Sequence, residues 1–173
     1  MPEPDLAALR SLLATEAPAD LGPGPRPGTI PLLPLQSRLD ALLGRAGRGT
    51  AALRALILLW HDHHEPAHEL VQDGSTADAS YVHGILHRRE PDPGNAGYWF
   101  HRVGRHAALA ELARRVAPLL EADPALRGRL LPRGQWDPLA FIEACSAGEE
   151  EDLLRRVQAV EFEVLLEHLA AGR

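Results

Sequence analysis

The chain has 173 residues, a length that one domain with its own hydrophobic core accounts for. Its formal net charge of -6 argues against general nucleic-acid binding, because such proteins present a basic face. All 18 basic residues are arginines, and the lack of lysine excludes Schiff-base and lysine-nucleophile chemistry.

A single cysteine, Cys145, excludes an internal disulfide, and its apolar surroundings predict a buried, unreactive thiol. The first residues carry acid where a signal peptide carries basic residues. The longest apolar run, residues 55–60, is too short to span a bilayer. We therefore expect a cytoplasmic protein that does not act within a membrane.

Leucines at helical spacing predict a first helix over residues 5–16. Residues 17–35 are rich in proline and glycine, which predicts an extended connector that wraps the domain. A short helix is predicted over residues 36–44. The next helix starts at Thr50 as N-cap and runs over residues 51–64, apolar nearly all round and therefore central and buried.

Pro66 predicts either a kink or a new helix start. The segment after it ends at the turn Asp73-Gly74. Further helices are predicted over residues 81–89, 95–102, 106–121 and 149–170, with another opened by Asp137-Pro138 and a loop over residues 124–132. The predicted fold class is all-α: a single helical-bundle-like domain, residues 1–173, with a proline-rich wrapping segment.

Residues 58–106 hold the distinctive chemistry of the chain, including eight of its nine histidines. On a continuous helix, at about 100° per residue, three of them share one face while His63 points away. These three are His61, His64 and His68. A second helix presents another narrow arc, formed by His83, His87 and Glu90.

Paired histidines four residues apart bind zinc, iron or manganese when a carboxylate joins them. The cofactor expected here is therefore a divalent metal such as zinc. Its candidate ligands are His61, His64, His68, His83 and His87. The candidate acid, base or orienting groups are His83, His87, Glu90 and Asp62.

Arginine forks suit carboxylates or phosphates, and aromatic faces suit flat or sugar-like ligands. The candidate ligand-binding residues are Arg88, Arg89, Asn95, Tyr98 and Arg102. Other interpretations stay open: the two adjacent arginines pair with nearby acids, Asn95 caps a helix, Trp99 fills the core, and the histidines form a metal-free polar network.

The same stretch resembles a widespread family of uncharacterised proteins. The shared pattern runs from Trp-His-Asp and a later His to Tyr-x-His-x-Ile-x-His-Arg-Arg-Glu-x-Asp and Asn-Ala-x-Tyr-Trp-Phe-x-Arg-Val-Gly. The resemblance implies a site but brings no activity with it. The site would comprise His61, Asp62, His68, His83, His87, Arg88, Arg89, Glu90, Asn95, Tyr98 and Arg102.

Three function classes follow from these residues. The first is a hydrolytic or isomerising enzyme, metal-dependent or acid/base, acting on a small anionic or sugar-like molecule. The second is a non-catalytic protein that binds a small anion, and the third is a structural protein with an inert histidine core. The expected partner is a small anionic molecule, with no nucleic acid and no membrane. The broad apolar arc of the last helix leaves a homodimer open.

Overall fold

Every regular element is helical within residues 5–45 and 47–172, the part of the chain that the computed structural model describes. The predicted all-α, single-domain fold is confirmed. In this part of the chain no helix combines the length and apolar composition needed to cross a membrane. In chain order the elements are α1 (Leu6–Leu13), α2 (Leu32–Leu43), the 3-10 turn η1 (Arg48–Thr50), α3 (Ala51–Trp60), α4 (His64–Val71), α5 (Ala77–Arg89), α6 (Pro93–Val103), α7 (Ala107–Val116), η2 (Leu119–Ala122), α8 (Pro124–Leu130), η3 (Pro132–Gly134), α9 (Pro138–Ala147) and α10 (Glu151–Ala170).

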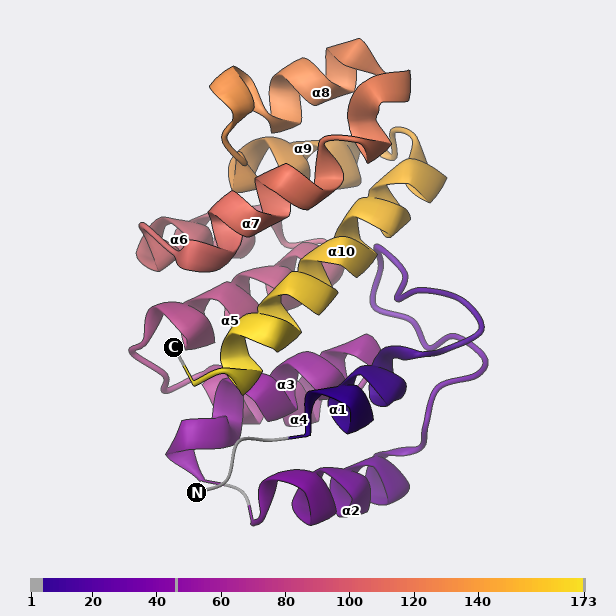
Figure 1. Cartoon of the computed structure of the whole chain (residues 1–173), viewed down its shortest axis with the longest axis vertical. Helices are drawn as coiled ribbons and strands as arrows, with labels where there is room; N and C mark the ends of the chain where they lie inside the picture. Colours follow the sequence, from indigo (N-terminus) through magenta and orange to yellow (C-terminus); the bar gives the residue numbers. More distant parts are fainter. Residues whose placement is uncertain (1–4, 46, 173) are drawn as a thin grey trace.

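Helix α10 runs obliquely through the middle of the molecule, with α8 and α9 at one end and α2 at the other (Figure 1). It packs against α1, α3, α7 and α9. Its side chains Leu154, Phe162 and Leu165 are fully buried in the shared core. The apolar arc of α10 is thus covered by helices of the same chain and no longer argues for a dimer face.

Helix α3 is the buried central helix that its composition predicts. All its residues from 53 to 60 are buried, because α1, α2, α4, α5 and α10 surround it. Burial of each leucine or isoleucine side chain of α3 contributes about 1.5–3 kcal/mol to the stability of the fold. This packing fixes α4 and α5, the two helices that carry most of the predicted site, against one rigid element.

The chain leaves α3 after Trp60, so the continuous helix predicted over residues 51–64 is wrong at its end. Asp62 has a φ of 65°, a left-handed conformation that an α-helix does not contain. Helix α4 then starts afresh with Pro66 in its first turn, where a missing N–H breaks no hydrogen bond. His61 and His64 therefore do not share a helical face.

Several other boundaries differ from the prediction. Helix α1 ends at Leu13 and not at residue 16, and α5 begins at Ala77 and not at residue 81. Helix α2 begins earlier than predicted, because Pro34 lies in its first turn and is tolerated there. The helix predicted over residues 106–121 is divided into α7 and η2, with Pro118 between them. The predicted loop over residues 124–132 contains α8, which Asp123 caps.

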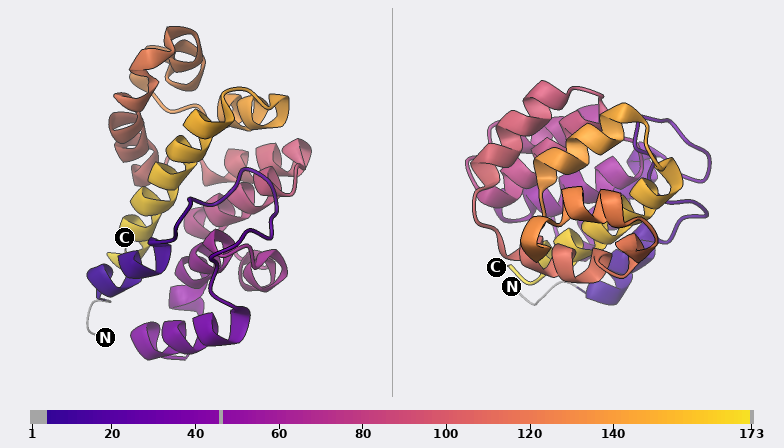
Figure 2. Two further views of the ribbon diagram at one scale, coloured as in Figure 1. Left: turned by 90° about the vertical axis from the view of Figure 1, so that its right-hand side faces the viewer. Right: turned by 90° about the horizontal axis from the view of Figure 1, so that it is seen from above.

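Residues 14–31 form the predicted extended connector, here called the strap, which loops along the side of the bundle and returns to α2 (Figure 2). Helix side chains hold its backbone. Nε of Arg89 donates to the carbonyls of Asp20 and Gly22 at 2.8 and 3.2 Å. The side-chain amide of Gln158 also donates to the Asp20 carbonyl, at 3.0 Å. Buried polar groups of α5 and α10 thus satisfy a segment that has no helical hydrogen bonds of its own.

Asp62 is the centre of a buried ion-pair network, here called the hub, with Arg26 and Arg89. Its Oδ1 accepts from Arg89 at 2.7 Å and from Arg26 at 2.9 Å, and its Oδ2 accepts from the Arg26 backbone N–H at 2.9 Å. Burial by itself raises the pKa of Asp62, but the hydrogen bonds from Arg89 and Arg26 lower it overall. The hub joins the strap, the end of α3 and the end of α5.

We predict that Asp62→Asn lowers the free energy of unfolding by about 3–5 kcal/mol at pH 7, because two buried guanidinium groups lose their counter-charge. Asparagine tolerates the left-handed backbone at this position, so the substitution removes the charge and keeps the turn available. Urea denaturation measures the change. Asp152→Asn, at a fully exposed carboxylate beside Arg155, is the control and should be silent.

The same pair of proteins gives a pH test. The folded-state pKa of Asp62 is lowered, so its contribution is complete above the unfolded-state pKa of about 3.9 and is lost as the pH falls through the lower folded-state value. The stability difference between the wild type and Asp62→Asn should therefore shrink as the pH falls below about 4. A difference that stays constant would show that Asp62 acts through its shape and not its charge.

Candidate metal centre

Three histidines from two helices meet at one point, here called the three-histidine site. His83 and His87 are four residues apart on α5, a spacing that places their rings one turn apart on one face. Their ring centroids lie 4.8 Å apart, and the two ring planes are nearly parallel, with an interplanar angle of 17°. Helix α4 packs on α5 and brings the ring of His68 to 4.8 Å from His83 and 5.9 Å from His87. One ring nitrogen from each lies within 4.8 Å of the other two.

His83 is the buried member of the site. Both of its ring nitrogens are enclosed and have no hydrogen-bond partner among the described residues. Burial lowers the pKa of His83 to about 4, and the charges of His87 and His68 add to the effect. The ring is therefore neutral at pH 7. An unpaired buried polar atom costs about 1–3 kcal/mol, and a bound metal ion would remove this cost at the one ring nitrogen that it binds.

Glu90 stands beside the three-histidine site at the C-cap of α5. Its Oε2 lies 3.1 Å from Nδ1 of His87, an ion-pair distance without the alignment of a hydrogen bond. A carboxylate here favours the proton on Nδ1, which leaves Nε2 of His87 able to bind a metal. His68 and His87 are half-buried, so the site reaches the surface on their side.

Helix α6 closes the other side of the site. Trp99 stacks on His83 with ring centroids 3.8 Å apart and an interplanar angle of 18°. The close approach of α5 and α6 depends on Gly84, where a Cβ would lie 2.8 Å from the ring of Phe100. Trp99, which the sequence left open as a core residue, is half-buried and forms a wall of the site.

The structure places the other two predicted metal ligands elsewhere. His61 accepts the Ile30 N–H at Nδ1, at 3.1 Å, and donates from Nε2 to the carbonyl of Leu12, at 2.8 Å. His63, predicted to point away, lies 2.8 Å from the carbonyl of Ile30. Both histidines therefore hold the strap. Burial lowers the pKa of His64 to about 4, and His64 is not one of the three histidines that meet.

Three other predicted site residues are held in buried ion pairs. Asp62 and Arg89 belong to the hub. Arg88 lies 2.5 and 3.2 Å from the two carboxylate oxygens of Glu161 on α10, and 3.1 Å from the side-chain oxygen of Gln158. The internal pairing that the sequence left open does occur, but with acids far along the chain. We assign none of these groups to catalysis or ligand binding.

The remaining ligand-binding candidates lie on α6. Asn95 donates to the carboxylate of Asp92 from its backbone N–H, at 3.1 Å, and from its side chain, at 2.6 Å, so it is part of the helix cap. Tyr98 is 56% exposed. The guanidinium carbon of Arg102 lies 5.4 Å from the centroid of Trp99 and 5.8 Å from that of Tyr98. Tyr98 and Arg102 thus stay available to a ligand.

A second group, here called the Asp78 cluster, was missed by the sequence reasoning. Oδ1 of Asp78 lies 2.9 Å from Nε2 of His106 and 3.2 Å from Nε2 of His168. The Ala108 N–H donates to Nδ1 of His106, at 3.2 Å, which puts the ring proton on Nε2. A metal-bound histidine binds the metal with one ring nitrogen and donates a hydrogen bond from the other. In His106, Nδ1 accepts a hydrogen bond and Nε2 donates to Asp78, so neither nitrogen is left for a metal. The cluster is therefore a hydrogen-bonded link between α5, α7 and α10. No local spacing points to it.

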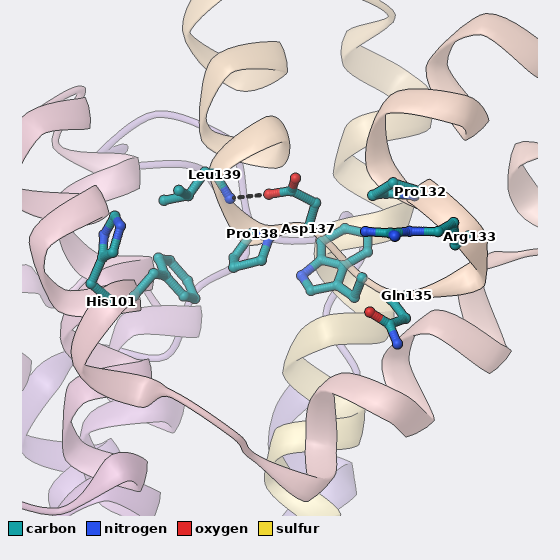
Figure 3. Close-up of a pocket in the computed structure, with 9 residues that line it drawn as sticks. His101, Pro132, Arg133, Gln135, Asp137, Pro138 and Leu139 are labelled. Atoms are coloured by element: carbon teal, nitrogen blue, oxygen red, sulfur yellow. Dashed lines mark hydrogen bonds between the residues drawn. The ribbon is translucent and has the colours of Figure 1, made fainter.

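A cavity of about 320 Å³ lies between α6 and the segment from η3 to α9 (Figure 3). It shares α6 with the three-histidine site but none of the three histidines. The carboxylate of Asp137 in its wall caps α9 by accepting the Leu139 N–H at 3.0 Å (Figure 3). Its lining residues are Phe100, His101, Pro132, Arg133, Gln135, Trp136, Asp137, Pro138 and Leu139. The cavity therefore does not coincide with the place where the ring nitrogens of the three histidines meet. The candidate site is the three-histidine site and not the cavity.

Comparison with protein-family models, curated proteins and solved structures finds no match for this chain. The family resemblance of residues 58–106 therefore stays a prediction, and the function is argued from the geometry of the site.

We predict different effects on stability when alanine replaces two glycines that lie on neighbouring helices. Gly84→Ala should destabilise the protein, because forcing a methyl group against Phe100 costs about 1–3 kcal/mol, more than the gain of about 1 kcal/mol in helix propensity. At Gly97 an added Cβ would meet only Leu139, at an ordinary 3.8 Å. Gly97→Ala should therefore raise the midpoint of urea denaturation or leave it unchanged. Equal effects at both glycines would contradict the tight α5–α6 contact.

Proposed function

We propose that the protein binds a divalent transition metal, zinc first, through His68, His83 and His87. The observation that carries this proposal is the meeting of three imidazoles at one point, while both nitrogens of the buried His83 lack a partner among the residues that the structure describes. Imidazole is the side chain that most often binds metals in proteins. A neutral, enclosed ring is already in the protonation state that a metal requires.

The spacing of the ring nitrogens supports a tetrahedral ion. Zinc–nitrogen bonds of about 2.0–2.1 Å place ligand atoms about 3.4 Å apart in a tetrahedron. The three nitrogens lie within 4.8 Å of one another, so movements of about 1 Å would reach that geometry. Because His68 and His87 are half-buried, their side chains have room for this adjustment.

Three protein ligands leave the fourth position of zinc open, as in catalytic zinc sites. Zinc lowers the pKa of a bound water to about 7 and so supplies hydroxide at neutral pH. We therefore propose metal-assisted hydrolysis of a small molecule. In this proposal Glu90 is a positioning residue, which keeps the proton of His87 on Nδ1 and Nε2 toward the metal. Asp62, bound to two arginines, has no part in it.

A metal-free polar core is the alternative interpretation of the same histidines. In such a core the buried polar atoms are hydrogen-bonded. The Asp78 cluster has this character, because His106 uses both of its ring nitrogens in hydrogen bonds. His83 uses neither. This contrast within one protein favours metal binding at the three-histidine site and a structural role for the other cluster.

We predict that the wild type binds one zinc ion per chain and that the double variant His83→Ala/His87→Ala binds none. Isothermal titration with zinc, after treatment with a chelator, measures the stoichiometry. Zinc at about 100 times its dissociation constant should also stabilise the wild type by about 2.7 kcal/mol and leave the double variant unchanged. Hydrolysis of p-nitrophenyl acetate should depend on zinc and be lost in the double variant.

Two single variants serve as controls. His101→Ala removes an exposed imidazole that bonds its own helix at Gly97, and His168→Ala removes one histidine of the Asp78 cluster. Both should keep one zinc ion per chain. Zinc binding that is lost in His168→Ala and kept in His83→Ala/His87→Ala would move the metal to the Asp78 cluster and overturn the proposal.

We predict that Glu90→Gln weakens zinc binding by about 10–100-fold, the usual effect of losing a carboxylate that orients a ligating histidine. The stability of the zinc-free protein should hardly change, because Glu90 is partly exposed and its pairing with His87 is a surface interaction. Zinc titration and urea denaturation of the same sample separate the two effects. A variant with unchanged zinc affinity would remove Glu90 from the site.

A further inference from the structure

Helix α6 presents an aromatic and cationic face beside the three-histidine site. Arg102 follows Trp99 by three residues and Tyr98 by four, so its side chain lies next to both on this face. One face of Trp99 covers His83. Tyr98 meets Trp99 edge-on with ring centroids 5.3 Å apart and is more than half exposed. Tyr98 is thus an exposed aromatic side chain in contact with Trp99, which itself stacks on the proposed ligand His83.

Three guanidinium groups of the described residues lie over aromatic rings, and two of them show what such a group binds in this protein. Arg26 lies 5.6 Å from the centroid of Trp60 and bonds the carboxylate of Asp62 at 2.9 Å. Arg88 lies 4.4 Å from the centroid of Phe141 and holds a carboxylate on α10 with two nitrogens. In both cases the ring takes the face of the guanidinium and a carboxylate takes its edge.

Arg102 has the aromatic ring of this arrangement but, among the described residues, not the carboxylate. Its guanidinium lies over Trp99 and Tyr98, and no carboxylate of the described residues pairs with it. Stacking uses the flat face of the group, so its five N–H donors remain in a planar fork that matches a carboxylate or phosphate. Arg102 is exposed, so this planar fork is open to an oxyanion that arrives with a ligand.

We infer that the substrate of the proposed metal centre is a small molecule that carries a carboxylate or phosphate beside a flat ring. This inference rests on the proposed function. The oxyanion binds the edge of Arg102, and the ring packs on the exposed Tyr98. Trp99, which touches both His83 and Arg102, sets the distance between the anion and the metal. Arg102 is thus the specificity-determining residue of the site.

The test uses cobalt in place of zinc, because the visible absorption of protein-bound cobalt reports changes among its ligands. The cobalt-loaded full chain is titrated with acetate, benzoate and inorganic phosphate, and isothermal titration calorimetry detects each anion whether or not it reaches the metal. We expect saturable binding, with benzoate binding more tightly than acetate because its ring contacts Tyr98. Arg102→Ala should weaken the binding of each anion by at least about tenfold, because one charge-assisted hydrogen bond is lost. Tyr98→Ala should abolish the preference for benzoate.

Arg105→Ala is the matched control, because Arg105 is also exposed, has no acidic partner among the described residues, and lies just beyond the end of α6. It should bind each anion as the wild type does. A protein that binds cobalt but responds to none of the anions, or in which Arg102→Ala behaves like Arg105→Ala, overturns this inference and leaves the metal centre standing. A protein that does not bind cobalt overturns the proposed metal centre and the inference with it.

Discussion

The burial of one carboxylate between two arginines is the interaction on which the rest of the structure depends. Asp62 ends α3 in a left-handed turn and at the same point neutralises Arg26 and Arg89. The turn directs the chain into α4, which carries His68, and the Arg89 side chain fixes the end of α5, which carries His83. The hub therefore sets how the two ligand-bearing helices meet, although none of its atoms belongs to the proposed metal centre.

The two adjacent arginines at the end of α5, Arg88 and Arg89, form ion pairs with different parts of the bundle. Arg89 reaches the hub and the strap, while Arg88 reaches Glu161 on α10. A buried ion pair adds little net stability over an apolar pair of the same volume, but a broken one is costly. Such pairs define one arrangement of helices and penalise the alternatives. The positively charged pair that suggests anion binding in the sequence is used to specify the fold.

The sequence predicts the helical class and the order of most helices, because leucine periodicity is a local pattern. The histidines of residues 58–106 are also a local pattern and indicate where the candidate site lies. The sequence predicts the pair His83 and His87 for the same reason. The break at Asp62 is not predictable from local preference, since an unfavourable backbone conformation is offset there by two distant arginines. The pairing of Arg88 with Glu161 spans 73 residues and leaves no periodic pattern. Helix α8, by contrast, has an Asp-Pro start of the kind that was recognised for α9.

The strap also has a consequence for the order of folding. The helix side chains that bind its carbonyls come much later in the chain: Arg89 lies 69 residues beyond Asp20, and Gln158 lies 138 residues beyond it. Contacts of such long sequence separation form late, because the intervening chain must first be ordered. During synthesis the strap leaves the ribosome well before α10, whose Gln158 completes the hydrogen bonds of the strap carbonyls. A protease should therefore cleave the strap faster in a nascent chain that still lacks α10 than in the finished protein.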